Sequence, residues 1–395
     1  MRHLRSMLAL GTVAAAAACS DGQSPTAAKP AAADPSAVRL APVLEAANGQ
    51  GIEGSYIVVL KRAANPEAEA GRQRLQPHFV YSAAFNGFAA ELTPGELQAL
   101  RRNPNVEYIE QNQVVHAATT QSGATWGLDR IDQRARPLSG TYTYTTTASN
   151  VRAYIIDTGI YTSNSDFGGR AAVSYDALGG NGIDCNGHGT HVAGTVGGAK
   201  YGVAKGVQLR AVRVLNCSGS GTSAQVLAGI NWVAANATKP AVANMSLGGG
   251  FSSTENSAVN TLANNGIFIA VAAGNENQDA CNVSPASAAN STTVGATTST
   301  DARATYSNYG GCVDLYAPGS SITSDWYGST TASNTISGTS MASPHVAGVA
   351  ALYKGTYGDA SYSTIRSWLT TNATANVVTG NPAGTPNRLL YKAAL

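Results

Sequence analysis

Charged residues are scarce in this chain. Asp, Glu, Lys and Arg make up 12% of its 395 residues, against about 25% in a typical soluble protein. The 25 basic and 23 acidic residues give a net charge of +2, and no basic stretch stands out. Because nucleic acids are bound by clustered cations, this composition argues against a nucleic-acid partner.

Long apolar runs are missing as well. No stretch of about 18 apolar residues occurs, so the sequence predicts no membrane-spanning helix. The 43 glycines follow no G-X-Y period and therefore indicate turns rather than collagen. At 395 residues the chain is long enough for two or three domains, and its core needs neither disulfide nor metal to form.

The first residues have the pattern of a secretory signal peptide. A short cationic head at 1–5 precedes the apolar segment 7–18, so we assign residues 1–19 to the signal. A buried helix is the alternative. Residues 16–19, Ala-Ala-Ala-Cys, resemble a lipoprotein cleavage box without its usual Leu, and the precursor would then be lipid-anchored through Cys19. Residues 20–53 are rich in Ala, Pro and Ser, which is typical of a flexible linker.

The composition changes near residue 118. Eight of the ten glutamates lie between Glu45 and Glu110, and only Glu255 and Glu276 follow. We therefore expect two units, 54–118 and 119–395.

The first unit reads as β-α-β-β-α-β. Its helix at 96–102 begins with a Thr93–Glu96 capping box and Pro94. This order predicts a small ferredoxin-like α+β domain. The strands are expected at 55–61, 79–81, 85–92 and 106–115, and the other helix at 66–76.

The second unit alternates apolar strands with helices. Continuous apolar strands indicate a parallel sheet that helices cover on both faces, hence an α/β fold with ligands at the carboxyl ends of strands. The expected strands are 151–156, 209–215, 242–247 and 266–272, and the expected helices 189–197, 223–236 and 254–265.

Three polar residues of this unit point to nucleophilic catalysis. Asp157 ends an expected strand, His188 opens a helix, and Ser340 opens another. A serine hydroxyl becomes nucleophilic when a histidine removes its proton and a buried carboxylate orients that histidine. Each residue alone has an ordinary structural explanation, such as a helix cap, but the three together in this order favour a catalytic triad.

Their motifs resemble those of the subtilisin-like serine peptidases, the subtilases. The blocks are Asp157-Thr158-Gly159, NGHGTHVAG at 186–194 and GTSMASPHVAG at 338–348, in the order Asp, His, Ser. Segments 126–133, 201–205, 244–250 and 386–391 are similar to the proteinase K family and its aqualysin-like secreted bacterial members. Residues 54–118 resemble the inhibitor-type propeptide of the same family.

This resemblance implies a three-layer subtilisin-like fold with a mostly parallel sheet, and a secreted serine endopeptidase of broad specificity. It would prefer apolar or aromatic residues before the cleaved bond. It would mature by self-cleavage near Ala118–Thr119, after its propeptide had served as folding aid and inhibitor, and it would act as a monomer on proteins and peptides. The implied oxyanion donor is Asn275. The implied substrate-binding residues are Gly219, Ser220, Gly221, Ser246, Leu247, Gly248, Ala272, Ala273 and Gly274.

The same resemblance predicts disulfide bonds and metal ligands. The four cysteines after Cys19 allow three pairings, and the absence of C-x-x-C speaks against zinc. The family pattern implies Cys185–Cys217 and Cys281–Cys312. It also implies structural, non-catalytic Ca²⁺ at Asp314 with the carbonyls of Ala289 and Ser291. A second site is implied at Asp129, Asp132 and Gln133, for which a solvated loop is the alternative.

Three other functions compete with this interpretation. A serine esterase is disfavoured because residues 338–342 do not read G-x-S-x-G. A catalytically inactive binding protein is disfavoured by the complete triad. A lipid-anchored surface protein remains the third alternative.

Overall fold

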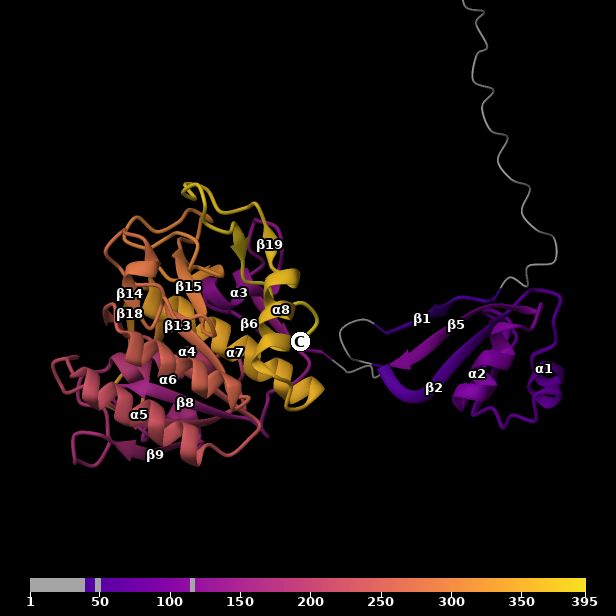
Figure 1. The fold of residues 1–395 in the computed structure, drawn as a ribbon, viewed down its shortest axis with the longest axis horizontal. Helices are drawn as coiled ribbons and strands as arrows, with labels where there is room; N and C mark the ends of the chain where they lie inside the picture. The colour runs from indigo at the N-terminus through magenta and orange to yellow at the C-terminus, as the bar shows by residue number, and fades with distance from the viewer. Residues whose placement is uncertain (1–39, 47–50, 114–117) are drawn as a thin grey trace, which may run out of the picture. The chain divides into compact units, whose positions relative to one another are not determined.

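The computed structural model describes residues 40–46, 51–113 and 118–395. The predicted signal peptide and Cys19 lie outside these residues. Contacts divide the chain into two compact units, one containing Gly54–Glu110 with the segment that ends at Leu44, the other Glu45–Glu53 with Gln111–Leu395 (Figure 1). Within the described ranges, no helix has the length and apolar character needed to cross a bilayer.

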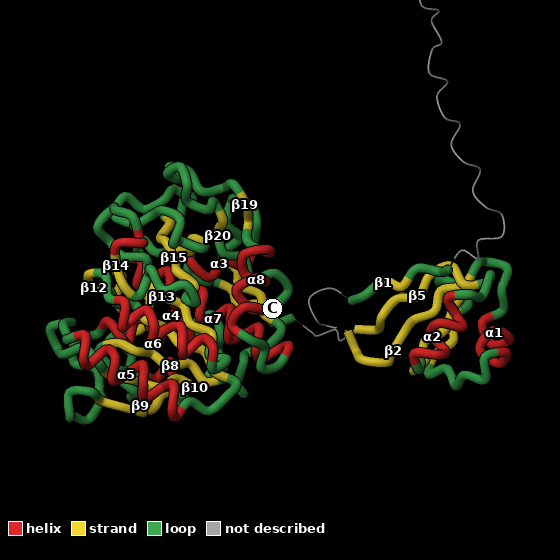
Figure 2. Tube along the Cα trace, viewed as in Figure 1, coloured by secondary structure: helices red, strands yellow, loops and turns green. Residues whose placement is uncertain are grey.

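The smaller unit is a five-stranded sheet with two helices (Figure 2). Its strand order is β1-β5-β2-β4-β3, and the last four strands have the expected ferredoxin-like arrangement. The side chains of Val58, Phe88, Leu100 and Ile109 form the centre of its core. The elements are β1 (Val43–Leu44), β2 (Gly51–Leu60), α1 (Pro66–Arg72), β3 (Phe79–Tyr81), β4 (Gly87–Glu91), α2 (Pro94–Arg101) and β5 (Val106–Gln113).

Two features of this unit differ from the sequence prediction. Part of the segment 20–53, expected to be a flexible linker, is structured, because β1 pairs with β5 and β2 already begins at Gly51. Ala41 is buried and its N–H donates to the Arg101 carbonyl, a long-range contact that local composition does not reveal. The helix expected at 66–76 ends at Arg72, shortly before Arg74 with its positive φ of 56°.

A nine-stranded sheet forms the centre of the larger unit. Its order is β19-β20-β16-β15-β13-β11-β8-β10-β9, and each adjacent pair is parallel except β19 with β20. Strands β11 and β13 are buried along their whole length, which requires cover on both faces. The nine strands are β8 (Arg152–Asp157), β9 (Ala171–Asp176), β10 (Gln208–Arg213), β11 (Ala241–Met245), β13 (Phe268–Ala272), β15 (Thr292–Thr297), β16 (Leu315–Pro318), β19 (Thr374–Ala375) and β20 (Arg388–Leu389).

Two helix pairs pack on this sheet (Figure 2). Helices α4 (His188–Gly197) and α7 (Thr339–Tyr357) contact each other and the central strands, and α5 (Ser223–Asn236) and α6 (Ser253–Asn264) form the second pair. The remaining elements are α3 (Trp126–Asp132), α8 (Tyr362–Asn372), β6 (Thr119–Ser122), β7 (Thr141–Tyr144), β12 (Gly249–Gly250), β14 (Val283–Ser284), β17 (Ile322–Asp325) and β18 (Ser333–Ile336), with short 3₁₀ turns at Ser165–Phe167 and Ala280–Asn282.

The side of the sheet on which the chain adds strands changes at β8. From this strand the chain first builds β10 and β9 on one side, and then β11, β13, β15 and β16 on the other. Crevices at the carboxyl ends of strands beside such a reversal are the usual ligand sites of open α/β sheets. Asp157, the last residue of β8, and Ser246, which follows β11, both lie there.

Candidate active site

The structure joins Asp157 to His188. The Nδ1 atom of His188, the first residue of α4, lies 2.8 Å from Oδ1 of Asp157. The carboxylate is fully buried and its Oδ1 also accepts from the Thr158 N–H. Burial works to lower the pKa of His188, but the attraction and hydrogen bond of Asp157 raise it above its usual value. A carboxylate in this position orients the imidazole and stabilises its protonated form.

Ser340 lies in the first turn of α7, across the cleft. Its Oγ donates to the Ser246 carbonyl at 3.2 Å, and the Ser246 hydroxyl donates to the Ser340 carbonyl at 2.7 Å. No hydrogen bond between Ser340 and His188 is formed among the described residues. Rotation of the serine about its Cα–Cβ bond would release Oγ from Ser246, and such bonds often tighten only when substrate is bound.

Asn275 presents its amide to the same cleft. Its Oδ1 accepts from the N–H of Thr339 at 2.8 Å and from the Thr339 hydroxyl at 3.0 Å. Because both bonds engage the carbonyl side, the NH₂ group is directed elsewhere, and Asn275 and Ser340 line one cavity of about 390 Å³. The Ser340 N–H is in the first helical turn, where backbone donors have no intrahelical partner.

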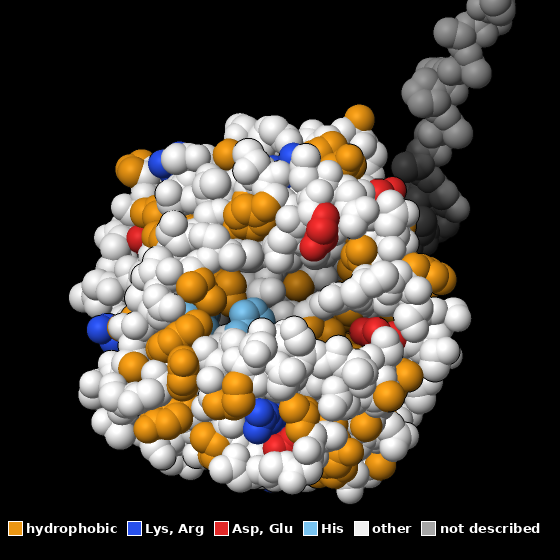
Figure 3. Space-filling model, turned by 90° about the vertical axis from the view of Figure 1, so that its left-hand side faces the viewer, with side chains coloured by type: hydrophobic (Ala, Val, Ile, Leu, Met, Phe, Trp, Pro, Cys, Tyr) orange, Lys and Arg blue, Asp and Glu red, His pale blue; other side chains and the backbone are white. Residues whose placement is uncertain are grey.

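A second cavity, of about 560 Å³, extends from His188 along the cleft. Gly219, Ser220 and Gly221 line it, and so do Ser246, Leu247 and Gly248. Leu247 and Gly248 also line the cavity beside Ser340, so the two cavities share a wall. Figure 3 shows this face of the molecule, with a histidine side chain exposed in a hollow.

The cavity beside Ser340 is only partly as expected. Ala272 and Gly274 line it, but Ala273 is fully buried and its carbonyl accepts from the Asn308 amide. A charged residue, Glu276, also contributes to the lining, and the Asn308 amide donates to its Oε2.

Family comparisons agree with this geometry. A model of the subtilase family matches residues 149–389, and a model of the I9 peptidase inhibitors matches residues 55–118. The chain belongs to the subtilase family. The fold predicted from the resemblance is thereby confirmed, and the protein is a serine endopeptidase of the subtilisin type with an I9 propeptide.

Individual relatives cover most of this subtilase. It is 52% identical over 378 residues to the extracellular serine proteinase of Thermus sp. (strain Rt41A), a match that covers 89% of this chain and 92% of that protein. It is 48% identical over 363 residues to the alkaline serine exoprotease A of Vibrio alginolyticus, covering 86% and 67%. The crystal structure of a cold adapted subtilisin-like serine proteinase matches with a TM-score of 0.67 and 52% identity, over 69% of this chain and 100% of that one.

Sequence analysis missed the residue that holds the start of α4 in place. Oδ1 of Asp184 accepts from the hydroxyl of Thr158, next to Asp157, and from the backbone N–H groups of Asn186 and Gly187. Its Oδ2 accepts from the backbone and hydroxyl of Thr190. The signal that could have revealed it is an acidic residue four positions before His188.

Asn244 and Ser343, which were also not predicted, form hydrogen bonds that connect to Ser340 through Ser246. The buried side-chain amide of Asn244 donates to the Ser246 hydroxyl at 2.8 Å, and the Ser343 hydroxyl donates to the Asn244 side-chain Oδ1 at 2.7 Å. This chain of hydrogen bonds links the end of β11 to the first turn of α7. No local sequence pattern reveals it, since the partners are 99 residues apart.

Both disulfides of this subtilase have the pairing implied by the resemblance. Cys185–Cys217 ties the turn before α4 to the loop that carries Gly219. Cys281–Cys312 closes the loop beside Val283 of the Ser340 cavity.

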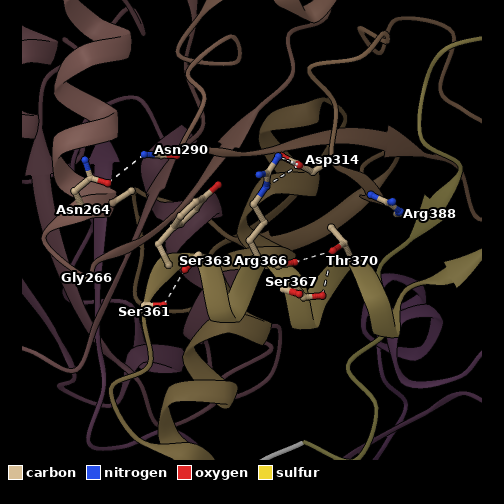
Figure 4. Close-up of a pocket in the computed structure, with 12 residues that line it drawn as sticks. Asn264, Gly266, Asn290, Asp314, Ser361, Ser363, Arg366, Ser367, Thr370 and Arg388 are labelled. Atoms are coloured by element: carbon tan, nitrogen blue, oxygen red, sulfur yellow. Dashed lines mark hydrogen bonds and ion pairs between the residues drawn. The ribbon is translucent and has the colours of Figure 1, made fainter.

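The first expected calcium position has a different partner. Oδ1 of Asp314 accepts from Nε and Nη2 of Arg366 at 2.9 and 2.5 Å (Figure 4). Its Oδ2 accepts from the Thr293 N–H. Burial raises the pKa of Asp314 despite the opposing effect of Arg366. The carboxylate is thus already paired with a cationic side chain. As the side chains lie, Asp314 does not fit a cation site.

The second expected position is richer in oxygen. Oδ1 of Asp129 accepts from both the N–H and the hydroxyl of Ser139, Oε1 of Gln133 also accepts from the Ser139 N–H, and the hydroxyls of Ser139 and Thr141 are 2.7 Å apart. Asp132 instead pairs with Lys392 and accepts from Thr143. These oxygens suit the hard Ca²⁺ ion, although nowhere in the described ranges do three or more His, Cys, Asp or Glu gather around a metal position.

Proposed function

We propose that this subtilase hydrolyses peptide bonds with Ser340 as nucleophile, His188 as general base and acid, Asp157 as its orienting carboxylate and Asn275 as oxyanion donor. The observation that carries this proposal is the 2.8 Å contact between Asp157 and His188 at the cleft that Ser340 and Asn275 also line.

Each step follows from this arrangement. Nε2 of His188 removes the proton of Ser340 as the serine Oγ attacks the peptide carbonyl, and Asp157 stabilises the resulting imidazolium. The Asn275 amide and the Ser340 N–H donate to the oxyanion. The imidazolium then protonates the leaving amine, and a water activated by His188 releases the acyl group.

Substrate binds as an added strand in this proposal. Residues 219–221 and 246–248 supply backbone partners on both sides of an extended peptide, whatever its sequence. The side chain before the cleaved bond enters the 390 Å³ cavity, where Leu247, Ala272 and Val283 favour apolar or aromatic groups. Glu276 lies exposed and paired with Asn308, so it does not occupy the apolar part.

The propeptide is proposed to be removed by the enzyme itself. Cleavage between Ala118 and Thr119 leaves 395 − 118 = 277 residues, and residues 118–120 are exposed as cleavage requires. Residues 54–118 would remain bound as a product inhibitor after assisting folding. The mature enzyme would act as a monomer, which size-exclusion chromatography with light scattering would test.

Export is proposed from the first 19 residues and from the relatives named as extracellular. Anchoring through Cys19 rests on residues 16–19 alone. Mass spectrometry of the precursor and mature N-termini would separate the two forms and locate the maturation site.

We further propose a structural Ca²⁺ held by Asp129, Gln133, Ser139 and Thr141, with Asp132 nearby in sequence. Bound there, the ion would stabilise the fold, and none of these residues belongs to the catalytic cluster. Calcium binding at Asp314 instead is the alternative that the comparison of the Asp129→Asn and Asp314→Asn variants tests.

Hydrolysis of casein by purified enzyme tests the central proposal. Activity that a serine-directed inhibitor abolishes, and that the Ser340→Ala variant lacks, is expected. Hydrolysis of small esters without casein cleavage would favour an esterase, and binding without any cleavage would favour an inactive binding protein.

A further inference from the structure

Glu255 contributes a buried carboxyl group to the substrate cleft. Only 6% of the residue is exposed, and its Oε1 is buried without a hydrogen bond to any described residue. It lines the 560 Å³ cavity together with His188 and Ser246. Leaving a buried carboxylate unpaired costs free energy, so a group of this kind in a cleft calls for a partner that arrives with a ligand.

Helix capping does not account for this carboxyl group. Glu255 is the third residue of α6, where a glutamate usually reaches back to the N–H of the cap residue. Glu96 of α2 does so, since the Thr93 N–H donates to its Oε2 at 2.8 Å. In α6 the corresponding N–H, of Ser252, donates instead to the Ser284 hydroxyl at 2.9 Å, which leaves Glu255 without this role.

The rest of the cavity lacks a compensating charge. Its lining contains no lysine or arginine, and His188 is the other titratable side chain in it. Leu215, Val226 and Leu247 supply apolar surface. A long aliphatic stem that ends in a cation fits such a site, because the stem packs on apolar walls while the head pairs with the carboxylate.

The alternating direction of side chains along the bound peptide identifies which substrate residue can reach Glu255. In an extended strand every second side chain points to the same face, about 6.8 Å apart. The side chain directly before the cleaved bond enters the cavity beside Ser340, so the second and fourth residues face the other cavity. His188, the proposed base, lines that cavity and acts next to the reacting bond, so the second residue is placed beside it. Glu255, from α6, lines the same cavity, and the fourth residue is the one left to reach it.

We infer that Glu255 selects substrates with lysine or arginine at the fourth position before the cleaved bond. This inference rests on the proposed function and adds a specificity determinant to it. Burial raises the pKa of Glu255, with no opposing cation in the described chain. An incoming cation would favour the ionised form and supply the missing partner.

The test compares two quenched fluorescent peptides that differ only at this fourth position, one with lysine and the other with its uncharged analogue norleucine. For the mature wild type we expect kcat/KM to be about tenfold or more higher for the lysine peptide, the size of a charge-assisted hydrogen bond. In Glu255→Gln this ratio should fall close to one. Glu255→Leu should favour norleucine, and the matched variant Glu276→Gln, which removes a carboxylate from the other cavity, should retain the lysine preference.

A wild-type pH series gives a measurement that needs no variant. The lysine-to-norleucine ratio should fall as the pH is lowered and Glu255 becomes protonated, while titration of His188 affects both peptides equally. A ratio near one in the wild type, or one that Glu255→Gln leaves unchanged, overturns the inference alone. If the wild type cleaves neither peptide nor casein, the proposed function fails and the inference fails with it.

Discussion

At the scale of single residues, the proposed oxyanion donor Asn275 is expected to have the most direct effect on rate. Asn275 is held through its carbonyl by Thr339, so its amide is oriented before substrate arrives. We expect Asn275→Ala to lower kcat by about 10²–10³, a value known from the equivalent donor of subtilisin, a member of the same family, and not obtained from this structure. KM should change little, because the donor acts mainly on the transition state.

Steady-state kinetics on one peptide would check this loss. Thr339→Val is the matched comparison, since it keeps the Thr339 N–H bond to Asn275 but removes the hydroxyl, which donates to Asn275 and accepts from the Gly274 N–H. A smaller loss of kcat is expected there. Equal kcat for Asn275→Ala and wild type would show that Asn275 is not the donor.

Another single residue, Asp325, should make stability depend on pH. Burial and the neighbouring Asp166 carboxylate raise its pKa from 3.8 to about 8, against the opposing influence of Arg170 and Lys200. Because the folded-state pKa is higher than the unfolded one, the fold favours the protonated form. The contribution of the protonated Asp325 carboxyl to the free energy of unfolding is fully present below about pH 4. It is lost as the pH rises through about 8, because the folded protein must then hold a buried negative charge.

Asp325→Asn should therefore raise Tm clearly at pH 9 and much less at pH 5. Both proteins would carry Ser340→Ala, so that self-digestion does not distort the melting curves. A gain in Tm that is the same at both pH values would contradict the raised pKa.

At the scale of elements, the turn before α4 connects electrostatics to catalysis. The Asp184 carboxylate anchors the first residues of α4, and its charge contributes to raising the pKa of His188. We expect Asp184→Asn to shift the acid limb of the kcat/KM profile to lower pH, because His188 must be neutral to act as base. It should also lower Tm, since buried hydrogen bonds are lost.

The pH profile distinguishes an effect of Asp184 on the pKa of His188 from an effect on folding alone. A purely structural role would lower Tm or kcat without moving the limb. Thr190→Val, which removes one of the Asp184 hydrogen bonds but no charge, should lower Tm and leave the limb in place.

Helices and strands could be predicted from the sequence where they are marked by a pattern of neighbouring residues. The continuous apolar runs gave β8, β11 and β13 within two residues, and the Thr93–Glu96 capping box marked the start of α2. The strand β1 was not predicted, because its pairing with β5 depends on residues more than 60 positions away. For the same reason the sequence indicated the triad but not Asp184, Asn244 or Glu255, whose roles depend on tertiary contacts.

At the scale of the whole molecule, the two units should separate only if the enzyme is active. Ser340→Ala removes the nucleophile without changing the core, so we expect a folded precursor in which residues 54–118 remain covalently joined. Gel electrophoresis and intact mass, from cells that lack other secreted proteases, would show this. Normal processing of the variant under these conditions would contradict self-maturation.

Purified residues 54–118 provide a second measurement on maturation. Added to the mature enzyme, they should inhibit casein hydrolysis in a concentration-dependent way. Absence of inhibition would show that the propeptide is not a product inhibitor, whatever its part in folding.

Metal removal should affect the stability of the whole enzyme more than its initial rate. Chelation should lower Tm, because an ion that binds only the folded state stabilises it by about 2.7 kcal/mol at a hundredfold excess over Kd. The initial rate should change little, since Asp129, Gln133, Ser139 and Thr141 are separate from the triad in sequence and in their hydrogen bonds. Asp129→Asn should have the lowered Tm without chelator and respond weakly to it.

The matched variant Asp314→Asn then distinguishes the two positions. Its Asp314–Arg366 pair is broken, so its Tm should fall in calcium and in chelator alike, with the response to chelation preserved. If Asp314→Asn instead abolishes the response while Asp129→Asn keeps it, calcium binds at Asp314 and must displace Arg366 from the carboxylate. Equal Tm of the wild type in excess calcium and in excess EDTA would exclude a stabilising calcium ion at either position.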